Sequence, residues 1–372
     1  MKKIYFNYLL LSACGLFLSI LIASCHKDPK VKPGPPAAQP FAKIGLYEID
    51  SSIYRRIFIP VSQVGTVDSI NYLVFDTGSS GMSIDAKGLL PASMITSSGI
   101  TVAGDSVNVN GITVTSQSGY IAFGNTQSEL REYGNLAYAI VKIGDSRGSV
   151  TTSRIPFFLY YKIQDVTSGG VLPPHSNDVF GVGPGVSFAN TRIGSPLSYF
   201  STANANGTTN GFKLATLNAA DFTLNAIYVS DLLTIGLVPS DLNASSGFIL
   251  HPLSFFSLTQ GGYSPDIPAT VSYNGTNVAA TILFDTGTPA ISIIANQTNP
   301  TNSSSLPPNT AVTITTNNGF TYQYTTTSDY NLTDVAKPSF TGDPRTIFGI
   351  DFFLSNEFLM DYTGHNIGLK NN

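Results

Sequence analysis

Two aspartates, Asp76 and Asp285, are the residues of this sequence most suited to chemistry. Each lies within a Phe-Asp-Thr-Gly segment, so the chain carries the same short motif twice. Two carboxyl groups held close together cannot both ionise cheaply, so they share a proton, and one can act as a base and the other as an acid on a single water molecule. One Asp-Thr-Gly triplet alone usually does no more than close a turn. The sequence around each copy therefore decides between these interpretations.

An internal repeat surrounds both aspartates. Residues 61–84 read VSQVGTVDSINYLVFDTGSSGMSI, and residues 271–293 read VSYNGTNVAATILFDTGTPAISI. Each copy runs from a predicted strand through a Gly-Thr turn to a second strand, the aspartate motif and an apolar-Ser-Ile end. The copies differ by one residue in the hairpin, as a turn or bulge variant would produce. An apolar segment containing glycine follows each copy, at 178–182 and at 346–350, which indicates two related halves.

This order of parts resembles the pepsin family of aspartic peptidases. In that family each lobe supplies one Asp-Thr/Ser-Gly loop, and an apolar-apolar-Gly segment crosses beneath the loop in a ψ-shaped arrangement. The resemblance spans residues 41–370, most loosely in the middle, and residues 347–370 look like the family's last ψ segment and closing strands. It implies a mostly β, bilobal, pepsin-like acid protease fold, with two related β-barrel lobes and a cleft between them.

The resemblance also implies a role for each residue of the two loops. Asp76 and Asp285 match the catalytic pair. The residues that match the supporting positions are Thr77, Gly78, Ser79, Thr286, Gly287 and Thr288. The threonine after each aspartate would exchange hydrogen bonds with the other loop, and the glycine would allow a close backbone approach. The next hydroxyl residue would orient the aspartate.

Members of the family cover the cleft with a β-hairpin flap, which carries a tyrosine over the substrate. The best match here is Tyr133, with Tyr120 and Tyr138 as rivals, although an ordinary strand tyrosine would look the same. The spacing from Asp76 to Tyr133 is longer than usual in the family. We therefore expect a flap that is short or rebuilt.

The rest of the chain also reads as mostly β. It is rich in Val, Ile, Thr, Tyr and Phe, and is interrupted at short intervals by turn residues, whereas long helical periodicity is scarce. Short helices are expected within 185–200, near Ser230 and at 351–355, and a polar loop at 296–308.

Composition excludes several other classes of protein. Of 372 residues 42% are apolar and only 11% charged, and the formal net charge is −4 without a basic block, so nucleic acid is not an expected partner. The four histidines are scattered and lack the spacing of zinc ligands, so neither a metal nor a cofactor is predicted. A phosphate-binding glycine loop is missing.

The first residues read as a targeting segment. Residues 1–24 combine a basic start with an apolar stretch, and they end in Ile-Ala-Ser before Cys25, which resembles a bacterial lipobox. The alternative is an ordinary signal peptide that happens to contain a cysteine. The only other cysteine is Cys14, within that segment, so no disulfide is expected. Residues 25–40 are rich in proline and predict an extended tether behind the lipidated Cys25.

We therefore predict a lipid-anchored aspartic endopeptidase at a bacterial cell envelope, with the outer membrane as the expected site. The predicted divisions are an N-terminal lobe at 41–248 and a C-terminal lobe at 249–372. The expected substrate is extended polypeptide, cleaved by a water that Asp76 and Asp285 activate, and we expect a monomer. The alternative is a noncatalytic lipoprotein of the same fold, which binds peptides or a protein partner in the cleft.

Overall fold

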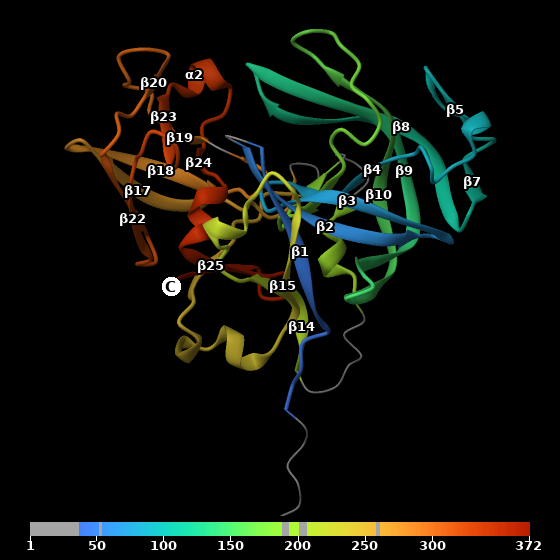
Figure 1. Cartoon of the computed structure of the whole chain (residues 1–372), viewed down its shortest axis with the longest axis horizontal. Coiled ribbons are helices and arrows are strands. Elements are labelled where there is room, and N and C mark those ends of the chain that lie inside the picture. Colours follow the sequence, from blue (N-terminus) through green and yellow to red (C-terminus); the bar gives the residue numbers. More distant parts are fainter. Residues whose placement is uncertain (1–36, 52–53, 188–192, 201–206, 258–260, 290) are drawn as a thin grey trace, which may run out of the picture. The chain divides into compact units, whose positions relative to one another are not determined.

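The computed structural model describes residues 37–51, 54–187, 193–200, 207–257, 261–289 and 291–372. Strands dominate this part of the chain (Figure 1), in agreement with the prediction from the sequence. The predicted signal peptide, Cys25 and residues 26–36 of the tether lie outside the described residues. Within the described ranges, no helix is long and apolar enough to cross a membrane.

The larger sheet contains fourteen strands of the described chain. In order across the sheet they are β16 (Ile249–Pro252), β26 (Asn366–Asn371), β25 (Asn356–Asp361), β14 (Thr209–Leu214), β15 (Ile227–Leu237), β1 (Ala42–Ser51), β2 (Tyr54–Val64), β3 (Val67–Asp76), β11 (Val179–Val182), β4 (Ser80–Asp85), β10 (Gly148–Asp165), β9 (Ser128–Asp145), β8 (Ile112–Asn125) and β7 (Ser106–Val109). Since β2 also pairs with β9, the strands β2, β3, β11, β4, β10 and β9 close into a barrel.

The smaller sheet contains eight strands of the described residues and belongs to the second half of the chain. In order they are β20 (Ser303–Ser305), β23 (Leu332–Ala336), β19 (Ile291–Ala295), β24 (Thr346–Phe348), β18 (Thr276–Phe284), β17 (Ile267–Tyr273), β21 (Ala311–Thr316) and β22 (Thr321–Thr325). The last strands of the chain, β25 and β26, return to the larger sheet, where β25 pairs with β14.

The remaining elements are short. Two strand pairs are β5 (Ile95–Thr96) with β6 (Gly99–Ile100), and β12 (Val186–Ser187) with β13 (Ile193–Gly194). Where the structure describes the chain, one α-helical turn, α2, spans Pro338–Thr341, and the 3₁₀ helices span Ala92–Met94, Pro196–Ser198, Ala219–Asp221, Pro239–Leu242, Ala244–Ser246 and Ile350–Leu354. Short helices thus occur at two of the three predicted places. The predicted helix near Ser230 is wrong, because Ser230 lies in β15, held between β1 and β14.

The repeat found in the sequence corresponds to the same local fold in both halves. In the first half β11 lies between β3 and β4, parallel to β3 and antiparallel to β4. In the second half β24 lies in the same way between β18 and β19. The loop from β3 to β4 and the loop from β18 to β19 therefore each pass over the end of a central strand. Asp76 is the last residue of β3, and Asp285 is the first residue after β18, so one aspartate stands at the start of each loop.

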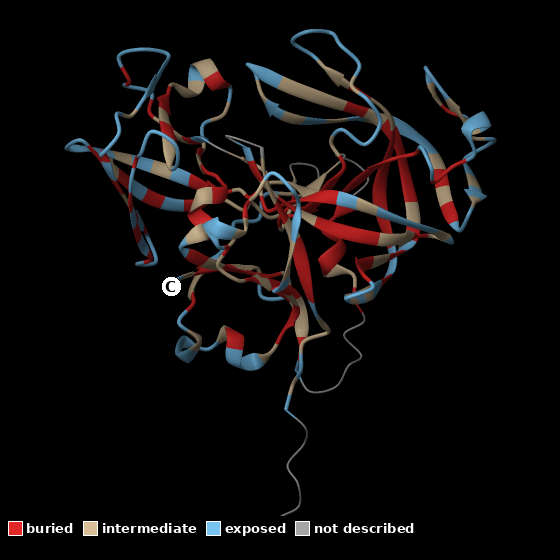
Figure 2. Cartoon of the chain, in the orientation of Figure 1, coloured by how far each residue is buried: buried red, intermediate tan, exposed pale blue. Residues whose placement is uncertain are grey.

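Burial increases along β3 toward the aspartate at its end. Its first six residues, VDSINY, are at least partly exposed in a hairpin with β2, whereas its last four residues, Leu73 to Asp76, are buried. A strand covered on both faces needs apolar side chains in both directions, which Leu73, Val74 and Phe75 supply. Figure 2 shows the buried residues gathered along β2, β3, β9 and β10 and the exposed ones at loops and hairpin tips.

A buried polar cluster lies inside the first half, between β9 and the start of β11. Glu132 on β9 is fully buried, and its Oε1 accepts a hydrogen bond of 3.0 Å from Asn177 Nδ2. Nearby, Asp178 accepts hydrogen bonds from the Tyr160 hydroxyl at 2.6 Å and the Asp85 amide at 2.9 Å. Burial raises the pKa of Glu132 to about 8, so this carboxyl group is protonated at neutral pH.

We expect Glu132→Gln to stabilise the protein at pH 8 by about 1–3 kcal/mol and to leave its stability at pH 4 nearly unchanged. Between the ordinary glutamate pKa and about 8, the folded protein holds one more proton than the unfolded chain. The free energy of unfolding therefore falls as pH rises through that window, and glutamine removes this slope. Urea unfolding at both pH values measures the effect. Glu129→Gln, on the same strand but ion-paired with Arg131 at 2.5 Å, is the matched control and should keep the slope.

Candidate active site

Asp76 and Asp285 lie at equivalent places, at or just after the ends of β3 and β18. Asp76 pairs in register with Gly181 of the central strand β11, and the Asp285 amide donates to the Phe348 carbonyl of β24 at 2.9 Å. Asp76 is 8% exposed, and Asp285 is partly buried. Each aspartate is thus fixed by the strand beneath its loop.

The two loops are joined by a reciprocal exchange between Thr77 and Thr286, both of them buried. The Thr77 amide donates to the Thr286 hydroxyl and the Thr286 amide to the Thr77 hydroxyl, each at 3.0 Å. Each hydroxyl in turn donates across to the other half, Thr77 to the Phe284 carbonyl at 2.7 Å and Thr286 to the Phe75 carbonyl at 2.6 Å. All four groups are satisfied, so the exchange holds the loops in one relative position.

The two carboxyl groups face each other across this exchange. A Cβ atom added to Gly78 would lie 2.5 Å from the Asp285 carboxyl carbon, and one added to Gly287 would lie 2.7 Å from Oδ1 of Asp76. Each carboxyl group therefore packs directly against the glycine of the opposite loop. Any side chain at either glycine would displace a carboxyl group, which explains why the loops need these two residues.

Hydrogen bonds within each loop orient the carboxyl groups. Oδ1 of Asp76 accepts from the Gly78 amide at 2.8 Å, and Oδ1 of Asp285 accepts from the Gly287 amide at 2.7 Å. The hydroxyl groups of Ser79 and Thr288 donate to the respective Oδ2 atoms at 2.5 and 2.6 Å. The structure therefore brings together all eight residues predicted for the two loops.

The surroundings of Asp76 favour a proton on the pair. Burial, and then the charge of Asp285 and a hydrogen bond to it, raise the pKa of Asp76 well above its usual range, although Ser79 and Gly78 oppose the shift. Because the two carboxyl groups are so close, the proton belongs to the pair and not to one aspartate. An acid and a base can then coexist in one place.

Two arginines beside the site were not predicted from the sequence. Arg56 on β2 donates from Nη1 to the Gly287 carbonyl at 3.0 Å, and burial lowers its pKa against the opposing charges of both aspartates. Its neighbour Arg55 forms an ion pair of 2.8 Å with Asp351, which lies two residues after Gly349 of the second apolar segment. Two adjacent arginines in an otherwise apolar strand were the signal available in the sequence.

The residue predicted for the flap, Tyr133, is not among the described residues that line the cavity beside the first aspartate loop. Tyr133 does lie on a long hairpin, formed by β8 and β9, but its ring packs on Lys162 Nζ at 4.0 Å and near Tyr120, and it lines a separate hollow. The hairpin residues that line the cleft beside Gly78 and Ser79 are Ile121, Ala122 and Phe123, from the other strand. This strand, β8, therefore lies beside the first aspartate loop, and Phe123 supplies an aromatic ring without a hydroxyl group.

The tip of this hairpin is bound to the second half of the chain. The Thr126 hydroxyl lies 2.9 Å from the carbonyl oxygens of both Phe340 and Thr341, and the Thr126 amide lies 3.2 Å from the Thr341 carbonyl. Gln127 Nε2 also donates to the Phe340 carbonyl at 3.2 Å. These bonds connect the tip to α2. The hairpin thus bridges the two halves, and we call this contact the tip bridge.

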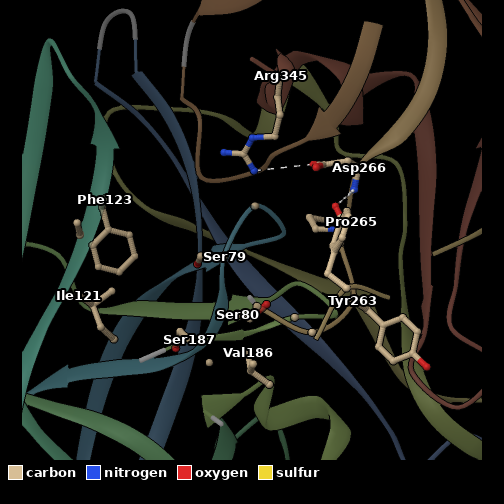
Figure 3. A pocket seen from close by; sticks show the side chains of 18 of the residues that line it. Ser79, Ser80, Ile121, Phe123, Val186, Ser187, Tyr263, Pro265, Asp266 and Arg345 are labelled. Atoms are coloured by element: carbon tan, nitrogen blue, oxygen red, sulfur yellow. Dashed lines mark hydrogen bonds and ion pairs between the residues drawn. The ribbon is translucent and has the colours of Figure 1, made fainter. Parts of the chain in front are cut away.

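A cavity of about 400 Å³ lies beside the first loop (Figure 3). Ile121 and Phe123 of the hairpin lie on one side, and Asp266 and Arg345 of the second half lie on the other, with Ser79 between them. Elsewhere in the described residues, no group of three or more His, Cys, Asp or Glu side chains is arranged to hold a metal ion. The carboxyl pair and the cavity next to it together form the candidate site.

Comparison with known proteins identifies the fold. Models of known protein families give no match to this chain, and a search of curated proteins gives none. Among solved structures, the aspartic proteinase from Irpex lacteus is similar with a TM-score of 0.55 and 15% identity, covering 88% of this chain and 97% of that chain. Basic 7S globulin from soybean is similar with a TM-score of 0.53 and 12% identity, covering 90% and 96%. The chain thus has the mostly β, bilobal fold of pepsin-like aspartic proteinases, as predicted.

We expect Thr126→Val to loosen the tip bridge without changing the two aspartate loops. Valine keeps the shape of threonine but cannot donate to the Phe340 and Thr341 carbonyls, and a hydrogen bond of this kind contributes about 1 kcal/mol. Amide hydrogen exchange at residues 124–129 should accelerate about fivefold. Thr151→Val, at an exposed position of β10, is the control. Unchanged exchange at the tip would show that the bridge does not hold the hairpin.

Proposed function

We propose that this protein is an aspartic endopeptidase that cleaves extended polypeptide. The observation that carries the proposal is the pair of carboxyl groups, each packed on the glycine of the opposite loop and hydrogen-bonded by its own loop. A fold alone does not define an activity. The carboxyl pair, its raised proton affinity and its position beside a cavity are the features that support catalysis.

The proposed reaction uses the one proton that the pair holds. The ionised carboxylate removes a proton from a water molecule, the resulting hydroxide attacks the peptide carbonyl carbon, and the protonated carboxyl group donates to the developing oxyanion. Collapse of the tetrahedral intermediate breaks the C–N bond, with proton transfer to the leaving amine. Ser79 and Thr288 keep the carboxyl groups oriented through these steps.

A noncatalytic peptide-binding protein is the second candidate. The specific observation in its favour is the cleft face of the hairpin, where Phe123 stands and no tyrosine hydroxyl is available from Tyr133. One of the two similar structures is named as a proteinase and the other as a globulin, so the fold agrees with either function. The retained carboxyl pair, with every supporting hydroxyl and glycine present, favours the enzyme.

We expect Asp76→Asn and Asp285→Asn each to lower peptide hydrolysis about 10²–10⁴-fold, because either change removes the acid or the base from the pair. Digestion of a peptide library between pH 3 and 8, with products identified by mass spectrometry, measures this. Asp105→Asn, at an exposed position away from the cleft, makes the same change of charge and should leave the rate unchanged. Binding of library peptides without cleavage by the wild type would favour the second candidate.

We also propose that the protein is lipid-anchored through Cys25 at a bacterial cell envelope, at the outer membrane. The support is in the sequence, namely the apolar segment before Cys25 and the proline-rich tether behind it.

Cys25→Ala should abolish incorporation of a labelled fatty acid and move the protein from the membrane fraction to the soluble fraction. Cys14→Ala is the matched control, and equal labelling of both variants would contradict the proposal.

A further inference from the structure

The cavity beside the first aspartate loop carries charge on one side only. Its charged lining residues, among those described, are Asp266 and Arg345, both from the second half of the chain. Arg345 lies close enough to the catalytic pair for the charge of Asp285 to contribute to the raised pKa of the guanidinium. Anything bound in this cavity therefore lies next to the reacting groups.

Arg345 is already engaged by another carboxylate. Its Nε lies 2.9 and 3.2 Å from the two carboxylate oxygens of Asp343, and its Nη2 lies 2.8 Å from Oδ2 of the same residue. Its Nη1 lies 3.8 Å from Oδ1 of Asp266, which is beyond hydrogen-bond distance. Asp343 thus neutralises Arg345, and the three side chains together carry a net charge of −1 when ionised.

Asp266 is the less tightly paired carboxyl group of the three side chains: Ser264 interacts with it, but Arg345 lies beyond hydrogen-bond distance. The Oδ1 atom of Asp266 is buried and accepts no hydrogen bond from the described residues, while its side chain as a whole keeps 23% of its surface exposed. The exposed part of the Asp266 side chain lines the cavity, and a carboxylate there attracts a cation because a low local dielectric strengthens the interaction.

The opposite side of the cavity suits an aliphatic stem. Ile121 and Phe123 of the hairpin line it, and the other apolar lining residues include Val186 of β12 and Phe256, which is 63% exposed. Glycines and serines form most of the remaining described wall, together with Ala122, Tyr263 and Pro265. The Tyr263 ring is stacked on His365, with 3.8 Å between the ring centroids. A lysine or arginine side chain has this combination of an apolar stem and a cationic end.

We propose that this cavity is a substrate pocket for a basic side chain, with Asp266 as the residue that determines the preference. The proposal rests on the proposed peptidase function and makes it more specific: the substrates are polypeptides that place lysine or arginine in the pocket beside the cut bond. The side-chain stem packs against Ile121 and Phe123, and its ammonium or guanidinium group meets the Asp266 carboxylate. A glutamate in the same place would meet a net negative charge and is disfavoured.

Binding of labelled peptides to the full chain tests the pocket separately from catalysis. We would use the Asp285→Asn variant, so that peptides stay intact, and a peptide series in which each position in turn carries lysine, norleucine or glutamate. Fluorescence anisotropy should show one position at which lysine binds about tenfold tighter than norleucine, and glutamate binds more weakly than either. Asp266→Asn, added to this protein, should reduce the lysine preference to about twofold or less, whereas Asp266→Glu should keep most of it.

Asp105→Asn, which removes the same charge from an exposed position outside the cavity, is the matched control and should leave the preference unchanged. Equal binding of lysine and norleucine at every position would overturn the proposal. An equal loss of preference in Asp266→Asn and Asp105→Asn would also overturn it, since the effect would then come from overall charge. A wild type that cleaves without a basic preference would refute the pocket alone. A wild type that never cleaves but shows the Asp266-dependent preference would refute the peptidase alone.

Discussion

The reciprocal exchange between Thr77 and Thr286 is the interaction on which the rest of the structure depends. It requires the carbonyl groups of Phe75 and Phe284, the last residues before the aspartates, to arrive at the same place from two different strands. The exchange fixes the relative position of the two loops because it is buried. At an exposed position, water could form hydrogen bonds with the same amide and hydroxyl groups. The two hairpins, each with its central strand β11 or β24, are the elements that deliver both strand ends to that point.

Connections near the exchange keep the two halves from separating. The chain ends in β25 and β26, which leave the second ψ segment and pair within the larger sheet. At the start of β2, the Arg55 amide donates to the Pro289 carbonyl at 3.1 Å, and its guanidinium group is paired with Asp351. Both side chains of this ion pair are largely buried, with 6% and 11% exposed. Loss of either partner would leave a buried charge without compensation, which is far more costly than loss of a surface pair.

The sequence predicted those parts of the site that are repeated. Asp76 and Asp285 could be paired because the same hairpin, motif and apolar segment occur twice in the sequence. This order can be recognised without any knowledge of the packing. Tyr133 could not be placed in this way, because the face to which a strand residue points depends on register. The long β9 pairs with both β8 and β10, and each pairing is shifted by an irregularity, between Val114 and Ser118 and between Tyr160 and Lys162. Arg56 and Asp266 were missed for a related reason, since only the tertiary fold brings them to the cleft.

The charges around the carboxyl pair connect substrate binding with proton binding. Arg56 is bound to the Gly287 carbonyl and Arg345 to Asp343, so both cations near the pair are held by acceptors of the protein itself. A cationic substrate group at Asp266 would add a positive charge near the pair, and a nearby positive charge favours the ionised form of a carboxyl group. Binding of such a substrate would therefore lower the proton affinity of the pair. In the proposed mechanism the pair needs one proton, so in the proposed pocket a bound basic side chain would also shift the pH range in which the pair holds that proton.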